Sequence, residues 1–296
     1  MWLVIALSFT IPLGLDLYMP VPEDNPITSE NVELGRRLFQ DRRLSRDGRV
    51  ACVSCHDPRR AFSSSQAQAI GVFNRKGRRN APALINRAWG RAFFWDGRTP
   101  TLEEQVLEPI QDPNEMDLAL AEAERRLGLD ATTIARALAS YVRSVLSGDA
   151  PYDRFINGDR GALSQEQQRG LQIFRGKGNC AACHVGPTFS DERPHNTGVA
   201  WRAGVFTDPG RVGVTNRPED RGAFKTPTLR EVARTSPYMH DGSLRTLEEV
   251  VSFYSDGGRR NPTLDPEIRP LRLTSAERRA LVAFLKSLSG TVREGN

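Results

Sequence analysis

The distribution of apolar and polar positions along the chain is helical, and no run of residues reads convincingly as a sheet. In the stretch from Thr132 to Gly148, apolar residues such as Ile134, Leu138 and Val142 recur every three or four positions and fall on one face of a helix. Clusters of Gly and Pro, for example between residues 257 and 262, mark long loops. The pattern predicts an all-α fold with long loops and little strand.

The first 26 residues differ in character from the rest. The run from Trp2 to Leu15 is apolar and has the length of the apolar core of a signal peptide, which is too short to span a bilayer comfortably. Signal peptides normally begin with Lys or Arg, and neither precedes this run. Residues 20–26 are rich in Pro and are interpreted as a linker. We therefore expect residues 1–26 to be an atypical signal or a short membrane anchor, followed by a linker.

The remainder of the chain contains an internal duplication, which is the signature of repeated structural units. Five features occur in the same order in both halves: a Gly-x-x-apolar-Phe motif, a Pro-centred motif, an Asp-Gly turn, a Thr-Leu-Glu-Glu motif and a helix ending in Ser-Gly. The matched segments are 35–39 with 170–174, 80–84 with 225–229, 95–97 with 240–242, 101–104 with 246–249, and 132–148 with 275–290. The duplication predicts two tandem domains of similar structure, residues 27–160 and 161–296.

All four cysteines lie in two pentapeptides of one pattern. These are Cys52-Val53-Ser54-Cys55-His56 and Cys180-Ala181-Ala182-Cys183-His184. Cys-x-x-Cys-His is the attachment motif of c-type haem, in which both thiols add to the porphyrin vinyl groups and the His binds iron. A thioredoxin-like pair or a zinc site does not require His after both pairs. The motifs predict two tandem cytochrome-c-like domains with one covalent haem each, and therefore a protein exported to the periplasm.

Charge changes this interpretation little. The chain has 41 Lys plus Arg against 36 Asp plus Glu, a net charge of +5, and a pI near 9.3. Such a surplus fits an acidic protein partner as well as nucleic acid. The basic cluster from Arg75 to Arg79 is interpreted as a solvated loop, or as a contact for haem propionates or a partner. Neither the compartment nor any known motif supports binding of nucleic acid.

The two halves differ at the position where a sixth iron ligand could lie. Tyr254 stands thirteen residues after Asp241, and Pro109 stands thirteen residues after Asp96. Tyr is an axial haem ligand that favours higher oxidation states of iron, whereas Pro has no donor atom. Tyr254 could also be a core aromatic residue.

Only two further histidines, His195 and His240, could act as sixth ligands. A non-enzymatic electron carrier with two His ligands on each iron would need both of them. We expect each instead to hydrogen-bond a haem propionate or a loop carbonyl.

From about residue 31 to residue 290, the sequence resembles the superfamily of bacterial di-haem cytochrome c peroxidases and MauG. The resemblance is closest to the MauG-like branch, which includes MauG and MbnH. Besides the haem motifs, the segments that carry it are 79–82, 94–98, 102–105, 109–110, 115–116 and 237–242.

The resemblance implies roles for individual residues. The haem attached at His56 would be the peroxide site, with Gln105 and Glu115 in its distal pocket and Glu115 moving a proton between the peroxide oxygens. Trp95 would pass electrons between the haems. Without the resemblance, Glu115 would read as a solvated carboxylate and Trp95 as a core aromatic residue.

The resemblance also implies one metal ion besides the haem irons. Asn80 and the backbone carbonyls of Thr235 and Pro237 match an inter-domain calcium site, whose oxygen ligands suit a hard cation. Without the resemblance, Asn80 would read as a turn residue.

Two departures separate the chain from the ordinary peroxidases of this superfamily. Val72 stands where many of them have a His that blocks the peroxide iron, and Tyr254 stands where they have Met. Together with Pro109, these residues favour a MauG-like enzyme that reacts with hydrogen peroxide at an open N-terminal haem. Such an enzyme would oxidise a partner protein, with Tyr or Trp as the modified residue.

Two other functions remain open from the sequence. The first is a peroxidase that reduces hydrogen peroxide to water with electrons from a small cytochrome or cupredoxin. The second is the non-enzymatic di-haem electron carrier. An open coordination site that reacts with peroxide would exclude the carrier.

Overall fold

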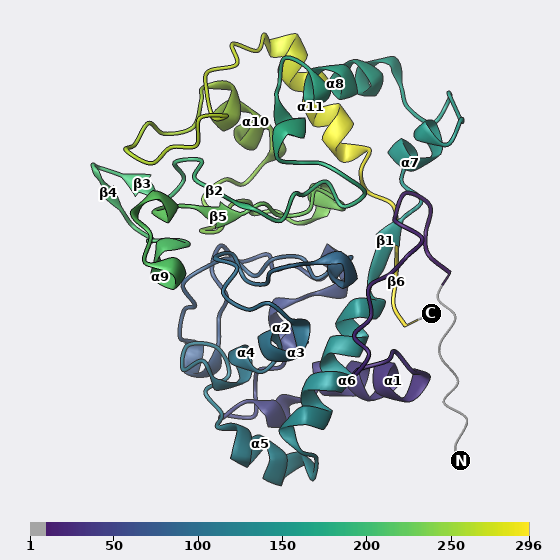
Figure 1. The fold of residues 1–296 in the computed structure, drawn as a ribbon, viewed down its shortest axis with the longest axis vertical. Coiled ribbons are helices and arrows are strands. Elements are labelled where there is room, and N and C mark those ends of the chain that lie inside the picture. Colours follow the sequence, from purple (N-terminus) through teal and green to yellow (C-terminus); the bar gives the residue numbers. More distant parts are fainter. Residues whose placement is uncertain (1–9, 296) are drawn as a thin grey trace.

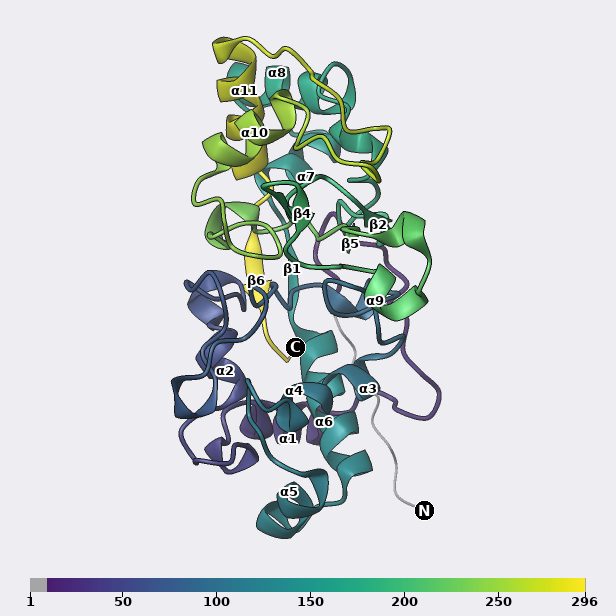
Figure 2. The same ribbon diagram turned by 90° about the vertical axis from the view of Figure 1, so that its left-hand side faces the viewer.

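The computed structural model describes residues 10–295, and it shows two helical halves stacked along the long axis of the molecule (Figures 1 and 2). The helices of the first half and the junction are α1 Ser29–Phe39, α2 Cys52–Cys55, α3 Leu102–Gln105, α4 Glu108–Gln111, α5 Leu120–Leu127, α6 Ala131–Ser144 and α7 Pro151–Ile156. Those of the second half are α8 Gln165–Arg175, α9 Val212–Thr215, α10 Leu247–Ser255 and α11 Ser275–Lys286. The all-α prediction with long loops is confirmed.

Short strands join segments that are distant in the sequence. The strands are β1 Leu146–Gly148, β2 Pro194–His195, β3 Trp201–Arg202, β4 Val205–Phe206, β5 Phe224–Lys225 and β6 Thr291–Arg293. They form three antiparallel pairs, β1 with β6, β2 with β5 and β3 with β4. Within residues 10–295, no helix has the length and apolar character needed to cross a bilayer.

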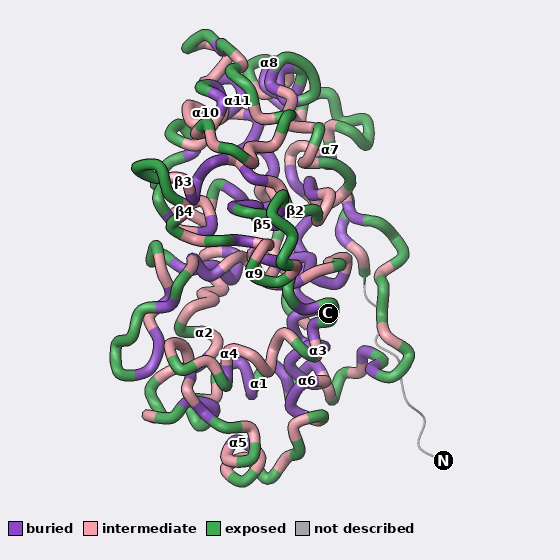
Figure 3. The backbone as a smooth tube through the Cα atoms, turned by 60° about the vertical axis from the view of Figure 1, so that its left-hand side comes forward, coloured by how far each residue is buried: buried purple, intermediate pink, exposed green. Residues whose placement is uncertain are grey.

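Each half is built on one pair of closely packed helices. In the first half α1 packs against α6, and in the second α8 packs against α11. Gly35 of α1 approaches the backbone of Ala137 so closely that an added Cβ would overlap its carbonyl oxygen, and Gly170 of α8 has the same relation to Ala280. The duplicated glycines therefore mark the points where the paired helices cross. Figure 3 shows the buried residues along α6 and α11.

Side-chain caps fix where the paired helices begin. The Ser164 hydroxyl accepts a hydrogen bond from the Gln167 backbone N–H, and the Gln167 side chain accepts one from the Ser164 N–H. Thr274 and Glu277 cap α11 in the same way. Such reciprocal caps satisfy backbone donors that have no partner within the helix.

The helix predicted from Thr132 to Gly148 is shorter than expected. Helix α6 ends at Ser144, and residues 146–148 form strand β1. The Val145 carbonyl accepts a hydrogen bond from the Asn86 N–H instead of continuing the helix. Strand β1 then pairs with β6, which brings the end of the second half to the junction between the halves (Figure 1).

Residues 10–27, which we call the N-terminal strap, pack against the folded halves. The backbone of Leu13 exchanges hydrogen bonds with Asp149, and Asn25, in the stretch expected to be a linker, is 1% exposed. The Asn25 amide donates to the Glu103 carboxylate at 2.6 Å. The expected signal or anchor lies partly in residues 1–9, outside the described residues.

The two halves meet through reciprocal backbone hydrogen bonds. The N–H of Lys225 donates to the carbonyl of Trp95, and the N–H of Asn80 donates to the carbonyl of His240, both at 2.7 Å. These four residues occupy matched positions in the duplicated sequence. The interface is therefore approximately two-fold symmetric.

Candidate functional site

A cavity of about 650 Å³ runs through the boundary between the halves and reaches both Cys-x-x-Cys-His motifs. Cys55 and His56 line it in the first half, and Cys183 and His184 line it in the second half. A smaller pocket of about 70 Å³ lies beside the first motif and includes Cys52. The fold thus brings the two pentapeptides, 128 residues apart in the sequence, to one connected space.

The histidines of the two motifs are oriented in the same way. His56 Nδ1 lies 2.9 Å from the carbonyl oxygen of Phe62, and His184 Nδ1 lies 2.8 Å from that of Phe189. Each Nδ1–H donates to its carbonyl, which leaves Nε2 unprotonated and available to a metal ion. Second-shell hydrogen bonds of this kind are usual for metal-binding histidines. Burial lowers the pKa of both rings, which favours the neutral ligand form.

The cysteines are free and available for covalent attachment. None of the four forms a disulfide. Burial raises the pKa of Cys52 to about 12 and that of Cys55 to about 11, and burial also raises the pKa of Cys180 to about 12. Paired thiols, a His with a free Nε2 and an adjoining cavity are what a covalent haem requires. The residues therefore fit one c-type haem in each half.

Tyr254 lies on α10 and lines the cavity together with the second motif. Burial raises the pKa of its phenol, with the neighbouring Cys183 and Cys180 contributing in the same direction. Helix α10 begins at Leu247 and is capped by the Thr246 side chain. In the matched region of the first half, two short helices, α3 and α4, replace the continuous α10, and Pro109 lies on α4.

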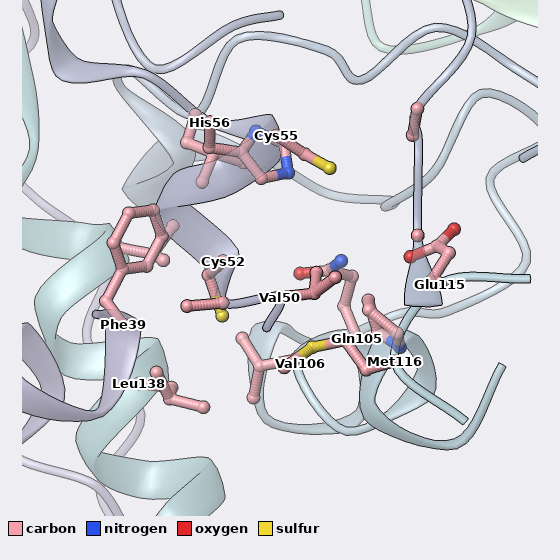
Figure 4. Close-up of a pocket in the computed structure, with 16 residues that line it drawn as sticks. Phe39, Val50, Cys52, Cys55, His56, Gln105, Val106, Glu115, Met116 and Leu138 are labelled. Atoms are coloured by element: carbon pink, nitrogen blue, oxygen red, sulfur yellow. The ribbon is translucent and has the colours of Figure 1, made fainter. Parts of the chain in front are cut away.

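The pocket beside the first motif contains the residues expected to form the peroxide site. Gln105, Pro109 and Glu115 all line it with His56. Figure 4 shows the His56 imidazole on one side of the pocket, and the Gln105 amide and Glu115 carboxyl on the other. The pocket is otherwise mostly apolar, so its polar groups are few and face a shared space.

Glu115 has the acid–base character that a proton-transfer role requires. Burial raises the pKa of its carboxyl to about 7, with the nearby Asp112 and then Glu108 acting in the same direction and Arg98 opposing them. A group with this pKa can both accept and return a proton near neutral pH.

The loop that carries Val72 is fixed over Glu115. Val72 is fully buried, and its N–H donates to the Glu115 carbonyl at 2.8 Å. A Cβ on Gly71 would overlap the carbonyl oxygens of Asn114 and Glu115, so glycine permits this close approach. The loop offers no imidazole to the pocket.

Trp95 lies at the boundary between the halves and lines the larger cavity. Its indole N–H donates to the Asn80 carbonyl at 2.8 Å. Its ring lies edge-on to His240, with 6.5 Å between ring centroids. Both its backbone and its side chain are therefore held at the interface.

The three residues expected to bind calcium reach the same part of the interface. Asn80, Thr235 and Pro237 all line the larger cavity, and the peptide bond before Pro237 is cis. Arg60 donates to the carbonyl of Ser236, between the two expected carbonyl ligands. The Asn80 amide N–H₂ donates to the Gln66 carbonyl, which leaves the amide oxygen as its possible metal ligand.

His195 does not have the partners expected from the sequence. Its Nδ1 and Nε2 donate to Asp265 and Asp191 at 2.6 and 2.9 Å. Contacts with the Cys183 sulfur, Asp265 and Asp191 raise the pKa of His195 to about 10. With both nitrogens bonded to carboxylates, His195 has no free donor atom for iron, a propionate or a carbonyl. The expectation for this residue is wrong because Asp265 approaches from 70 residues away.

Ion pairs across the interface were not predicted. Arg79 binds Asp96 of its own half and Asp208 of the other half, at 2.6 and 2.7 Å. The solvated-loop interpretation is therefore wrong for Arg79. Arg87 forms a two-pronged pair with Glu192, which also contacts the buried Lys225 at 3.3 Å. Such long-range pairs have no local sequence pattern.

Comparison with known proteins agrees with this geometry. A family model described as di-haem cytochrome c peroxidase matches residues 29–161, and one described as cytochrome c matches residues 167–289. The methylamine utilization protein MauG of Methylorubrum extorquens is 39% identical over 288 residues, covering 91% of this chain and 81% of that protein. Cytochrome-c peroxidase IdrP2 of Denitromonas iodatirespirans is 37% identical over 314 residues, covering 91% and 84%.

A solved structure extends the comparison to the fold. The crystal structure of a MauG-like protein associated with microbial copper homeostasis has a TM-score of 0.86 and 32% identity, covering 96% of each chain. The site and fold define a two-domain haem c protein. The chain belongs to the di-haem cytochrome c peroxidase and MauG family. It is a peroxide-dependent oxidoreductase, and its family implies haem c cofactors and a partner protein or electron donor.

Proposed function

We propose that this oxidoreductase works in the periplasm and uses both haems to oxidise a Tyr or Trp of a partner protein, as a MauG-like enzyme. The observation that carries the proposal is the position of Tyr254, which lines the larger cavity together with the second haem motif. The matched residue of the first half, Pro109, lines the smaller pocket and has no atom that could bind iron. A phenolate ligand stabilises high oxidation states of iron. The C-terminal haem would then hold oxidising power until a protein substrate is available.

In this proposal the N-terminal half holds its haem through Cys52, Cys55 and His56, and the C-terminal half through Cys180, Cys183, His184 and Tyr254. Haem supplies the peroxide-binding position and the one-electron redox chemistry. The overall balance is one hydrogen peroxide, two protons and two electrons giving two waters, with both electrons taken from the partner protein.

Glu115 transfers a proton in this reaction. Its carboxylate accepts a proton from the incoming hydrogen peroxide and returns it to the departing oxygen, which leaves as water. The Gln105 amide, on the same side of the pocket, donates a hydrogen bond that orients the peroxide. Pro109 keeps that side free of a competing ligand, because its ring has no donor atom.

Trp95 carries electrons between the halves. It lines the cavity that reaches both motifs, and hydrogen bonds hold both its indole and its backbone. A fixed aromatic ring at this position shortens the distance that an electron must cross in each step between the two haem sites. One calcium ion bound by Asn80, Thr235 and Pro237 would hold the same interface.

The first test adds one equivalent of hydrogen peroxide to the purified diferric protein without prior reduction. We expect the ferric EPR signals of both haems to disappear and the oxidised state to persist in the optical and near-infrared spectra. No reaction before one haem is reduced would contradict the proposal, as would a resting spectrum with two six-coordinate low-spin haems.

The relatives also support a second candidate function. Several of them, including IdrP2, are cytochrome-c peroxidases. As a peroxidase, the protein would reduce hydrogen peroxide with electrons from a small cytochrome or cupredoxin. Sustained turnover with a reduced small cytochrome, together with rapid decay of the peroxide-oxidised state, would favour this function.

A further inference from the structure

Each half contains a cluster of three aromatic rings at the crossing of its paired helices. The rings of the first cluster, with centroids between 5.2 and 6.3 Å apart, belong to Phe39, Phe62 and Tyr141. Those of the second cluster, with centroids between 5.1 and 6.5 Å apart, belong to Phe174, Phe189 and Phe284.

Tyr141 and Phe284 occupy equivalent positions in these two clusters. The Cβ of Tyr141 lies against the crossing glycine Gly35, and the Cβ of Phe284 lies in the same way against Gly170. The duplication therefore repeats the three rings but not the hydroxyl group, which is present in the first half alone.

The first cluster contacts the iron-binding histidine of its half. The Phe39 ring lies 6.5 Å from the His56 imidazole, centroid to centroid, and lines the pocket beside the first haem motif (Figure 4). The Tyr141 ring lies 5.2 Å from the Phe39 ring. Both distances fall in the range of packed aromatic pairs, about 4.5–7 Å. One intervening ring therefore connects the phenol of Tyr141 with the haem site.

The Tyr141 hydroxyl has a base as its partner. Tyr141 is 1% exposed, and its hydroxyl donates a hydrogen bond to Glu294 Oε2 at 2.8 Å. Burial raises the pKa of this phenol, and Glu294 acts in the same direction, so the phenol is protonated. Glu294 itself is exposed and directly follows β6. The hydrogen bond thus joins a buried phenol to a carboxylate that is in contact with water.

A tyrosine beside the second cluster has a cation as its partner instead. The Tyr152 ring packs on Phe189 and Phe284, with centroids 5.1 and 5.7 Å away. Its hydroxyl accepts a hydrogen bond from the Arg175 guanidinium at 3.1 Å. A guanidinium has no acceptor atom and cannot take up a proton. Only the hydroxyl beside the first haem site is therefore bonded to a group that can receive its proton.

A phenol that loses an electron becomes a strong acid, so it is oxidised readily where a base stands ready for the proton. We propose that Tyr141 is a redox-active tyrosine, which gives one electron to the N-terminal haem site when peroxide has oxidised that site and no partner protein is bound. The Tyr141 O–H bond breaks, the electron passes through the Phe39 contact toward His56 and the haem, and the proton moves to Glu294 Oε2. A neutral tyrosyl radical and a protonated Glu294 result, and the return of the electron and the proton restores the pair.

Three substitutions test this step in the haem-loaded protein. Tyr141→Phe removes the hydroxyl and keeps the ring, as in Phe284 of the second half. Glu294→Gln keeps a carbonyl oxygen that accepts the hydrogen bond but cannot take the proton. Tyr152→Phe is the matched control, because it removes the hydroxyl beside the second cluster. Each protein is mixed with excess hydrogen peroxide without a partner protein, frozen rapidly, and studied by optical and EPR spectroscopy.

We expect the EPR signal of a tyrosyl radical in the wild-type protein and in Tyr152→Phe. The signal should be lost in Tyr141→Phe and strongly reduced in Glu294→Gln. A signal of equal size in wild type and Tyr141→Phe would overturn the proposal, and equal signals in wild type and Glu294→Gln would overturn the role of Glu294. If Tyr141→Phe fails to fold, Glu294→Gln still decides, since Glu294 is exposed.

The proposal rests on the reaction of peroxide at the N-terminal haem and does not depend on which partner is oxidised. The optical spectra separate its failure from that of the proposed function. Haem spectra that change with peroxide while no tyrosyl radical forms would overturn the role of Tyr141 alone. Haem spectra that do not change would overturn both.

Discussion

Arg230 and Asp153 form a salt bridge at 2.6 Å in which each side chain is only 1% exposed. The same guanidinium donates to the Gly14 carbonyl of the N-terminal strap and to the Pro187 carbonyl, three residues after His184. One buried cation therefore joins the strap, helix α7 and the loop that follows the second haem motif. The strap is thereby connected to the C-terminal haem site.

Removing one member of this pair should destabilise the protein strongly. We expect Asp153→Asn to lower the free energy of unfolding by roughly 3–5 kcal/mol, because it leaves a buried guanidinium without its counter-charge. Thermal unfolding of the haem-loaded protein measures the effect. The exposed pair between Lys286 and Glu248 provides the control, since Glu248→Gln should change stability by less than about 1 kcal/mol.

The helix crossings at Gly35 and Gly170 should not tolerate a methyl group. Each substitution to Ala places a Cβ against a carbonyl oxygen of the partner helix, and overpacking of this kind costs roughly 1–3 kcal/mol. Chemical denaturation of each variant would measure the loss. Gly213→Ala is a matched control in helix α9, where the nearest atom lies 3.9 Å from the added Cβ. Equal stability of Gly170→Ala and Gly213→Ala would contradict the packing argument.

The rate of reaction with peroxide should follow the ionisation of Glu115. Its pKa, raised by burial to about 7, keeps the carboxyl protonated below pH 7, so the rate should rise as pH increases through 7 and then level off. Glu115→Gln should abolish this dependence and lower the rate about 10²–10⁴-fold, the usual contribution of a general base. Stopped-flow spectroscopy over a pH series provides the measurement.

Stability gives an independent check on the same carboxyl. Its pKa in the folded protein lies above the ordinary value of 4.5, so protonation favours the folded state. The stabilisation is full below about pH 4.5 and is lost as pH rises through 7. Glu115→Gln should therefore be at least as stable as wild type at pH 8, and a large loss of stability there would point to disrupted packing instead.

Replacing Tyr254 should change the C-terminal haem and leave the peroxide pocket intact. We expect Tyr254→Met to raise the midpoint potential of that haem and to shorten the life of the peroxide-oxidised state, because Met ligation favours the reduced metal. Potentiometric titration and EPR measure both effects. Tyr238→Phe is the control, because it also removes a tyrosine hydroxyl, but one that donates a hydrogen bond to the Val232 carbonyl. Identical potentials in wild type and Tyr254→Met would argue against a phenolate ligand.

Local and repeated patterns carried most of what the sequence could predict. Each haem motif is a continuous run of five residues, so it can be recognised without knowledge of the fold. The matched order of motifs in the two halves located both helix pairs, because each half repeats the same local sequence pattern. Helix α6 ends earlier than its own periodicity indicates, since residues 146–148 pair with a strand almost 150 residues later. The partners of Arg79 and His195 were missed for the same physical reason. Asp208 and Asp265 come from distant loops, and no local spacing reveals an ion pair made by tertiary packing.

The pairing of β1 with β6 also constrains the order in which the protein can be assembled. Strand β1 follows the first domain directly, but its partner is synthesised only after the second domain is complete. Until residues 291–293 arrive, β1 has no strand partner at the junction. The pairing that ties the end of the second half to the end of the first is therefore formed last during synthesis, and a chain that stops before residue 291 lacks it.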